Sequence, residues 1–220
     1  MLLAALVLAR SGSLFLSGGG TTDPAIVDAF LKACGGKAAR VVVLPLANED
    51  PKTGKSSEDF LHEHGATNTI HFAVDKPSDA DRAELKKQLD GARGVWMPGG
   101  QQQRFIDRLG EPWIKANVVP LLKKGVNFYG TSAGSMVCAA TMIVGPGKEK
   151  DTAETGPGFG LTKWVIDTHF KQRNREGRLR DALKTTGLKK GVGINETEWI
   201  VIRDDRIVEK HGTPTVIEIK

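Results

Sequence analysis

The segment GTSAGS, residues 130–135, places a serine among small residues at the junction of two apolar stretches. The stretch VNFYG before it suits a strand, and the stretch MVCAA after it suits a helix. Where GxSxG joins a strand to a helix, a sharp turn lifts the serine hydroxyl out of the sheet edge, and the helix N-terminus favours a developing negative charge. The pattern therefore predicts that Ser132 is a nucleophile, with an ordinary turn serine as the alternative.

A serine hydroxyl becomes nucleophilic when a neighbouring base accepts its proton, and histidine is the usual base. His169 alone stands at the end of an apolar, strand-like run, in WVIDTHF. The other histidines lie in a charged helix end, inside an expected strand or in an expected terminal hairpin: His62, His64, His71 and His211. We expect His169 to be the base, with a buried core histidine as the alternative.

A carboxylate must then fix the tautomer of the histidine and stabilise its protonated form. Glu196, in GVGINETEW, follows a short apolar strand that would end at the same sheet edge as His169. We expect Glu196 to be the third residue, with Glu198 and Asp167 as alternatives.

Backbone amides must stabilise the oxyanion of a tetrahedral intermediate. We expect one amide from Ala133, directly after the serine. The second should come from Gly99 and Gly100 in MPGGQQQRF, because glycine lets a backbone approach a substrate closely. A tight strand-to-helix turn explains these two glycines equally well.

The elements that must position these residues alternate along the chain. Strands are expected at 13–20, 40–47, 69–74, 94–100 and 126–130. Helices are expected at 24–34, 57–64, 78–89, 102–109 and 112–123. This alternation predicts an α/β fold with a doubly wound, mostly parallel sheet flanked by helices, whose functional residues gather at the carboxyl ends of the strands.

Two later stretches change character. Residues 145–160 are rich in glycine and proline and predict a loop, whereas residues 199–220 alternate around an Asp-Asp turn and predict a C-terminal antiparallel hairpin. The length suits a single catalytic domain, 1–220, in which 1–12 form an apolar N-terminal extension. That run is too short to span a bilayer and lacks a basic start, so we expect a cytoplasmic protein, with export as the alternative.

The composition of the chain limits the classes of partner that we expect it to bind. The net charge of +5 is spread over 31 basic and 26 acidic residues along most of the chain, so we expect neither nucleic acid nor a membrane as a partner. A basic cluster follows the histidine and is typical of an anion site: Lys171, Arg173, Arg175, Arg178 and Arg180. The two cysteines predict buried free thiols, and no side chains have the spacing of a metal site.

Four motifs together resemble the cyanophycinase branch of peptidase family S51, which also contains the aspartyl dipeptidases: MPGGQQ, GTSAGS, DTHFKQRNREGRL and GVGINETE. The resemblance covers most of the chain, from SGGG at residue 17 to the strand after Glu196. It implies a serine exopeptidase, without a cofactor or metal, on a sheet related to the class I glutamine amidotransferase fold. The implied substrate is a small peptide or cyanophycin, cleaved through an acyl-enzyme.

The resemblance also assigns residues. The nucleophile, base and acid carry over to Ser132, His169 and Glu196, and the GGxQ loop places Gly99, Gly100, Gln101 and Gln102 beside the substrate. The HFxQRxRxGRL segment implies substrate-side roles for Asp167, Arg173, Arg175 and Arg178. Guanidinium groups match free carboxylates with two parallel hydrogen bonds. A solvated helix whose arginines pair with Glu176 and Asp181 is the alternative.

The sequence departs from the family pattern at Thr168, Asn195 and Gln101, where glutamine, aspartate and aspartate are usual. These changes lie beside the expected catalytic residues, so they put polymer specificity in doubt rather than catalysis. The leading hypothesis is hydrolysis of β-aspartyl bonds, in cyanophycin or smaller isoaspartyl peptides. The alternatives are an α-aspartyl dipeptidase and, in another class, a binding protein without catalysis.

Glutamine amidotransferase activity is disfavoured because those relatives carry a cysteine at the elbow, where this chain has Ser132. Cys138 lies too far along the helix to replace it. The apolar N-terminal run and the edge of the terminal hairpin are the two candidate surfaces for a homodimer.

Overall fold

The computed structural model describes residues 11–219, so residues 1–10 of the apolar N-terminal extension lie outside the described part. In this part, no helix is long and apolar enough to cross a membrane. Its largest core cluster takes residues from Leu14 to Ile202.

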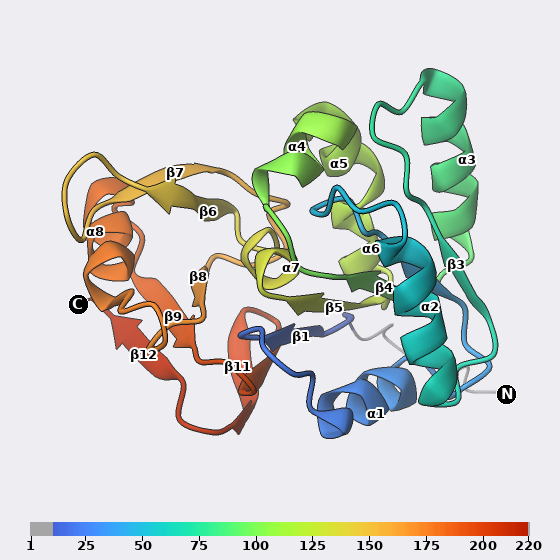
Figure 1. Ribbon diagram of the computed structural model, residues 1–220, viewed down its shortest axis with the longest axis horizontal. Coiled ribbons are helices and arrows are strands. Elements are labelled where there is room, and N and C mark those ends of the chain that lie inside the picture. Colours follow the sequence, from blue (N-terminus) through green and yellow to red (C-terminus); the bar gives the residue numbers. More distant parts are fainter. Residues whose placement is uncertain (1–10, 220) are drawn as a thin grey trace, which may run out of the picture.

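A seven-stranded sheet forms the larger half of the molecule (Figure 1), in the order β11-β10-β1-β5-β4-β2-β3. Its five parallel strands are β1 (Leu14–Ser17), β2 (Val41–Val43), β3 (Thr69–His71), β4 (Gly94–Met97) and β5 (Asn127–Thr131). The sheet ends in the antiparallel pair β10 (Trp199–Arg203) and β11 (Arg206–His211). The predicted mostly parallel sheet with an antiparallel hairpin is therefore confirmed.

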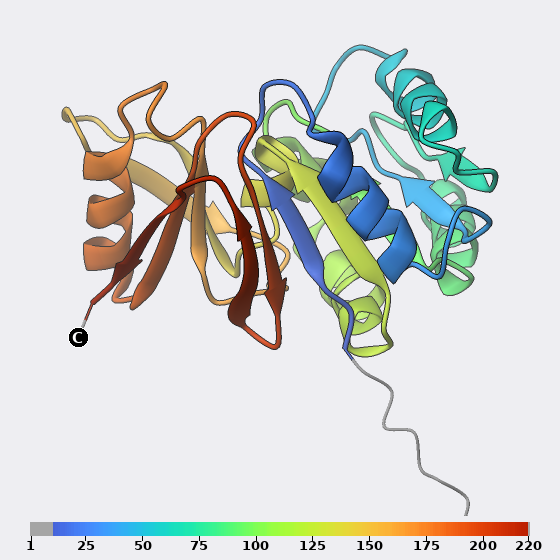
Figure 2. The same cartoon turned by 90° about the horizontal axis from the view of Figure 1, so that it is seen from below.

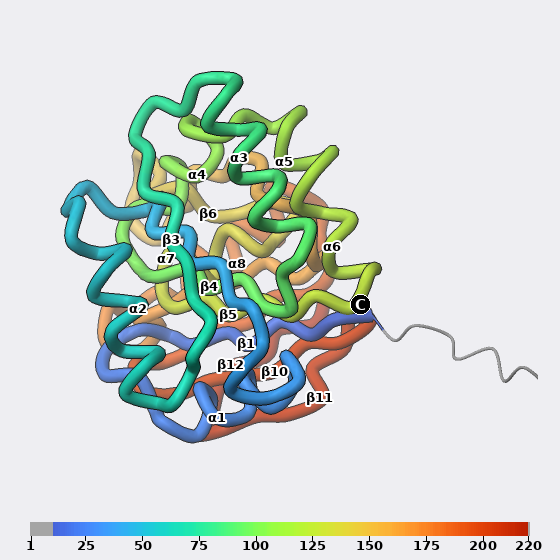
Figure 3. The backbone as a smooth tube through the Cα atoms, turned by 90° about the vertical axis from the view of Figure 1, so that its right-hand side faces the viewer, coloured from blue at the N-terminus to red at the C-terminus, as the bar shows by residue number. Residues whose placement is uncertain are grey.

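Helices cover both faces of this sheet, as the end-on view in Figure 3 shows. One face carries α1 (Pro24–Ala33) and α2 (Thr53–Glu63); the other carries α3 (Asp79–Asp90), α4 (Gln103–Leu109), α5 (Glu111–Asn117) and α6 (Val119–Lys123). Successive strand residues face opposite layers: Val95 packs in one core cluster and Trp96 in the other. Both faces of the sheet are buried, which explains its continuous apolar runs.

Apart from β10 and β11, the chain after residue 140 builds a second, smaller layer, seen beside the main sheet in Figure 2. A three-stranded sheet has the order β12-β9-β8, formed by β8 (Val165–Thr168), β9 (Lys190–Ile194) and β12 (Thr215–Glu218). The helix α8 (Glu176–Thr186) packs on it through Leu179 and Leu183. Strands β8 and β9 are parallel, so their carboxyl ends lie at one edge.

Two predictions about the later chain need correction. Residues 145–160, predicted to be a loop, contain the end of β6 (Thr141–Pro146) and all of β7 (Ala153–Pro157), which pair as an antiparallel hairpin. The terminal hairpin turns at Asp204 and Asp205, both at positive φ, as expected. Its last segment does not continue it, because β12 crosses to the smaller sheet and pairs with β9.

Candidate active site

Ser132 occupies a tight turn between β5 and the short helix α7 (Ala133–Met136). Its φ of 52° and ψ of −115° are rare for a residue with a side chain and mark a constrained backbone. The flanking glycines permit the turn, since a Cβ on Gly130 would collide with the carbonyl oxygen of Gly134, and one on Gly134 with that of Met97. The turn therefore presents the hydroxyl at the carboxyl end of β5.

His169 reaches this hydroxyl from the smaller sheet. It follows β8, and its Nε2 lies 2.8 Å from Ser132 Oγ. Its backbone has a φ of 49°, and its amide donates to the carbonyl of Gly18 at 2.9 Å, which ties the turn after β8 to the turn after β1. At 12% side-chain exposure, the imidazole is largely shielded and within the distance at which it can accept the serine proton.

Glu196 supports the far side of the imidazole. Its Oε1 lies 2.6 Å from Nδ1 of His169. Thr168 pairs with Ile194 in the parallel β8–β9 ladder, so the residues that follow each strand emerge together. A carboxylate at this place makes Nδ1 the protonated nitrogen and leaves Nε2 free to act as a base toward Ser132.

The other candidates for these roles lie elsewhere. Glu198 accepts from Nδ2 of Asn195 at 2.8 Å and from the amide of Thr213 at 3.0 Å, so it is turned away from the imidazole. Each of the remaining histidines has another partner: His62 contacts Thr69, His64 the Phe60 carbonyl, His71 Glu58 and His211 Asp23. Ser132, His169 and Glu196 are thus brought together.

The glycine loop after β1 forms a platform beneath this group, a role that the sequence reasoning missed. A Cβ on Gly19 would overlap the imidazole of His169, and one on Gly20 would lie 3.1 Å from Cβ of Glu196. The Gly19 carbonyl also accepts the amide of Thr197 at 2.9 Å. Three successive glycines at the end of the first strand were the available sign of this close approach.

The backbone beside Ser132 offers unused donors. Within residues 11–219, the amides of Gly100 and Ala133 donate to no protein acceptor. Gly99 passes close to the nucleophile, since a Cβ there would lie 3.4 Å from Cβ of Ser132. The Gly100 backbone is fixed at a φ of 144° against the Ala47 carbonyl, where any side chain would collide. These amides have the free capacity that an oxyanion requires.

The two glutamines after these glycines differ. Gln101 is exposed, and its amide donates to the carbonyl of Ala47 at 2.8 Å, so its side chain is free at the surface. Gln102 is buried, and its Nε2 donates to the carbonyls of Ile143 and Val144 in β6, at 2.6 and 3.0 Å. The side-chain amide nitrogen of Gln102 therefore joins α4 to the β6–β7 hairpin, and a contact of Gln102 with substrate stays a prediction.

Two arginines of the basic segment after His169 pair with a buried aspartate. Asp167 is fully buried and accepts from Arg178 Nε at 2.6 Å and from Arg175 Nη1 at 3.2 Å. Arg175 also donates to the Thr168 carbonyl at 2.8 Å. Burial lowers the pKa of Arg175, Asp167 opposes this effect, and the charges of Arg178 and Arg173 lower it further. The structure thus places Asp167, Arg175 and Arg178 in one ion network, and their substrate-side roles stay a prediction.

Arg173 has a different setting. Its amide donates to the carbonyl of His169 at 2.9 Å, so it lies one turn beyond the imidazole. Its side chain is exposed, and in the described part of the chain no carboxylate lies within ion-pair distance of it. Of the arginines predicted to bind substrate, Arg173 is the one whose guanidinium is free.

Neither cysteine resembles a nucleophile. Cys34 and Cys138 are buried free thiols, as predicted. Burial raises the pKa of Cys34 to about 12, and burial also raises the pKa of Cys138, whose Sγ lies 3.4 Å from the Gly134 carbonyl. Residues 11–219 also contain no group of three or more His, Cys, Asp or Glu side chains placed to hold a metal ion.

The chain matches the model of one known protein family. The model of Peptidase family S51 matches residues 13–210. A cyanophycinase from Geminocystis herdmanii is 28% identical over 198 residues, covering 87% of this chain and 73% of that protein. Peptidase E from Streptomyces coelicolor is 27% identical over 133 residues, or 55% of this chain and 53% of that protein.

A solved structure shares the fold. The crystal structure of a peptidase from an acI-B1 Actinobacterium superimposes with a TM-score of 0.71 at 18% identity, covering 96% of this chain and 89% of that one. The chain spans 62% to 73% of the length of the cyanophycinases that it matches.

Proposed function

Because the chain belongs to peptidase family S51, we propose that it is a serine exopeptidase that cleaves aspartyl peptides through an acyl-enzyme on Ser132. The observation that carries this proposal is the pair of short contacts on one imidazole: 2.8 Å from Nε2 to Ser132 Oγ and 2.6 Å from Nδ1 to Glu196 Oε1. A nucleophile, a base and a group that orients the base are the minimum machinery for acyl transfer.

The reaction follows from these positions. His169 Nε2 accepts the hydroxyl proton as Ser132 Oγ attacks the scissile carbonyl, and Glu196 stabilises the imidazolium that forms. The amides of Ala133 and Gly100 donate to the oxyanion, and the imidazolium gives its proton to the leaving amine. Water then attacks the acyl-enzyme with His169 again as the base, which releases the acid and restores Ser132 Oγ–H.

Arg173 gives the site its preference for a small, acidic substrate. An exposed guanidinium one turn from the general acid is placed to hold a free carboxylate on the leaving side of the scissile bond. Exopeptidases need such a group, because the end of the chain is what they recognise. Arg175 and Arg178 contribute by holding this segment in place through Asp167.

The linkage is tested by two isomeric dipeptides. We propose β-aspartyl bonds, in cyanophycin or isoaspartyl peptides, as the substrate, on the similarity to the cyanophycinases. The sister activity, an α-aspartyl dipeptidase, is the second candidate, favoured by the similarity to Peptidase E.

The purified chain should release arginine from β-Asp-Arg faster than from α-Asp-Arg, measured by amine release beside a digestion of cyanophycin. Turnover of the α-linked peptide alone would replace the first candidate by the second. Failure of a serine-directed probe to label the native chain would instead support a binding protein without catalysis.

A further inference from the structure

A pocket lies next to Thr131, the residue before Ser132, and none of its lining residues takes part in the proposed reaction. It has a volume of about 260 Å³ and lies between α2 and the carboxyl ends of β4 and β5. Thr131, which precedes the nucleophile, and Pro98, which precedes Gly99, form its edge toward Ser132. The pocket is thus one residue away in the chain from both Ser132 and Gly99.

The position of the pocket indicates which side of the scissile bond it serves. Strand β5 lies between β1 and β4 in the sheet, and His169 is tied to Gly18 beyond the end of β1. The leaving amine must face His169, because the imidazolium protonates it. Although Thr22 from the loop after β1 also lines the pocket, most of its lining comes from α2 and the ends of β4 and β5, which leaves it for substituents on the acyl side of the scissile bond.

The lining has the chemistry of a cation site. Asp50 supplies a carboxylate, Trp96 and Phe60 supply aromatic surface, and hydroxyls come from both α2 and the strand ends. None of the described residues that line it is a lysine or an arginine. Aromatic surface and a carboxylate together favour ammonium and guanidinium groups.

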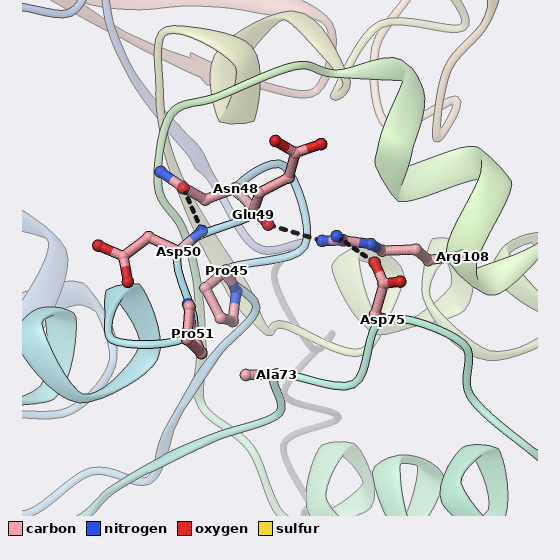
Figure 4. Close-up of a pocket in the computed structure, with 8 residues that line it drawn as sticks. All are labelled: Pro45, Asn48, Glu49, Asp50, Pro51, Ala73, Asp75 and Arg108. Atoms are coloured by element: carbon pink, nitrogen blue, oxygen red, sulfur yellow. Dashed lines mark hydrogen bonds and ion pairs between the residues drawn. The ribbon is translucent and has the colours of Figure 1, made fainter.

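Asp50 is the acid of this region that keeps its charge unpaired. Its neighbour Glu49 forms an ion pair with Arg104, and Asp75 forms one with Arg108. Figure 4 is a close-up of a neighbouring pocket that Asp50 also lines; in it Arg108 is directed at Asp75 and at the Asn48 carbonyl, while the Asp50 carboxylate points the other way. Within residues 11–219, no basic side chain lies within ion-pair distance of Asp50, whose carboxylate accepts only the backbone amide of Lys52, at 2.9 Å.

The floor of the pocket is a stacked aromatic pair. The ring of Trp96, which lines the pocket, stacks on the ring of Tyr129 at 3.6 Å between centroids. Tyr129 is fully buried, and Thr22 and Thr131, whose side chains lie near its hydroxyl, both line the pocket. Tyr129 therefore holds the Trp96 ring in place and does not itself reach a bound group.

We propose that this pocket binds a positively charged group on the acyl side of the substrate, through Asp50 and the aromatic surface of Trp96 and Phe60. The inference depends on the proposed acyl-enzyme in one respect only, which is the choice of the side of the scissile bond that the pocket binds. The group is either the free α-ammonium of an N-terminal aspartyl residue or a guanidinium carried by the acyl residue. With Arg173 on the leaving side, the site would recognise a substrate that carries a negative charge on the leaving side and a positive charge on the acyl side.

The test measures binding without turnover, in chains that carry Ser132→Ala. One ligand pair is Asp-Ala and succinyl-Ala, which differ only in the α-ammonium; the other is argininamide and citrullinamide, which differ in the guanidinium charge. Calorimetry should give tighter binding of the cationic member of at least one pair, by about tenfold for a charge-assisted hydrogen bond. The pair that shows the difference identifies the group.

Asp50→Asn should abolish this difference, since asparagine keeps the oxygen that accepts the Lys52 amide and removes only the charge. Glu49→Gln is the matched control, because Glu49 is already paired with Arg104, and it should preserve the difference. Equal binding within both pairs, or a preference that survives Asp50→Asn, would overturn the cation pocket. Hydrolysis of aspartyl peptides by the unmodified chain is measured separately, so failure of the proposed function would be recognised independently.

Discussion

Gly19 lies so close to His169 that a single added carbon would overlap the imidazole ring. The contact joins the turn after β1, in the main sheet, to the turn after β8, in the smaller sheet. Since Ser132 belongs to the first sheet and its base to the second, the geometry of proton transfer depends on how closely these turns pack. Holding two reacting groups in hydrogen-bond contact is worth several orders of magnitude in rate, and small displacements lose much of it.

Gly19→Ala should therefore reduce kcat by about 100-fold, because the methyl group must displace the imidazole from Ser132. Gly35→Ala is the control: Gly35 has a similar φ, 104° against 97°, and an added Cβ there meets nothing within 4 Å. Steady-state kinetics and thermal unfolding of both variants should show a similar loss of stability and a large loss of kcat in Gly19→Ala alone. Equal activity in the two variants would argue against the platform role.

Substitution of Arg173 should change the KM for the substrate, whereas loss of the ion network of Arg175 and Arg178 should change stability. Arg173→Ala should raise KM by about tenfold, as expected from the loss of a charge-assisted hydrogen bond, and leave the unfolding free energy nearly unchanged, because its side chain is exposed. Dipeptides with an amidated C-terminus should be insensitive to the substitution. A normal KM in Arg173→Ala would remove this residue from the substrate side.

Asp167→Ala should behave in the opposite way. Removing the buried carboxylate leaves Arg175 and Arg178 charged and unpaired, which should lower the unfolding free energy by about 3–5 kcal/mol in urea denaturation. A variant as stable as the original chain, with a raised KM, would restore the prediction that this network contacts substrate.

The sequence was most informative where the relevant contacts are local. Ser132 could be predicted because strand, elbow and helix are consecutive, and the flanking glycines follow from the close approach of the backbone. The parallel direction of the first five strands followed from their alternation with helices, and the structure confirms it. His169 and Glu196 could be proposed because each ends an apolar run, although the pairing of β8 with β9 was not visible locally.

Other features depended on contacts that composition does not reveal. The Gly-rich and Pro-rich stretch 145–160 has the composition of a loop, yet backbone pairing with β6 makes part of it a strand. Arg175 and Arg178 looked like solvent or substrate contacts, because nothing local shows that they meet Asp167 inside the fold. An aspartate within the apolar run WVIDT was the available sign that a buried positive partner must exist.

Thiol reactivity tests whether a cysteine, rather than Ser132, takes part in the reaction. Burial raises the pKa of both Cys34 and Cys138, so neither thiolate should form appreciably at pH 8. Iodoacetamide should leave the native chain unmodified and fully active, and should alkylate both cysteines only after unfolding, as read by mass spectrometry. Rapid loss of activity on alkylation of Cys138 would implicate a thiol in the reaction.

The nucleophile is tested most directly by covalent labelling with a fluorophosphonate, followed by peptide mapping. The arrangement of Ser132, His169 and Glu196 predicts one adduct, on Ser132, that disappears in Ser132→Ala together with peptide turnover, which should fall by at least about 1,000-fold. Binding of peptide to that variant should persist, so loss of activity cannot be ascribed to misfolding. An adduct on another residue, or a Ser132→Ala chain that still cleaves aspartyl peptides at the original rate, would contradict the assignment.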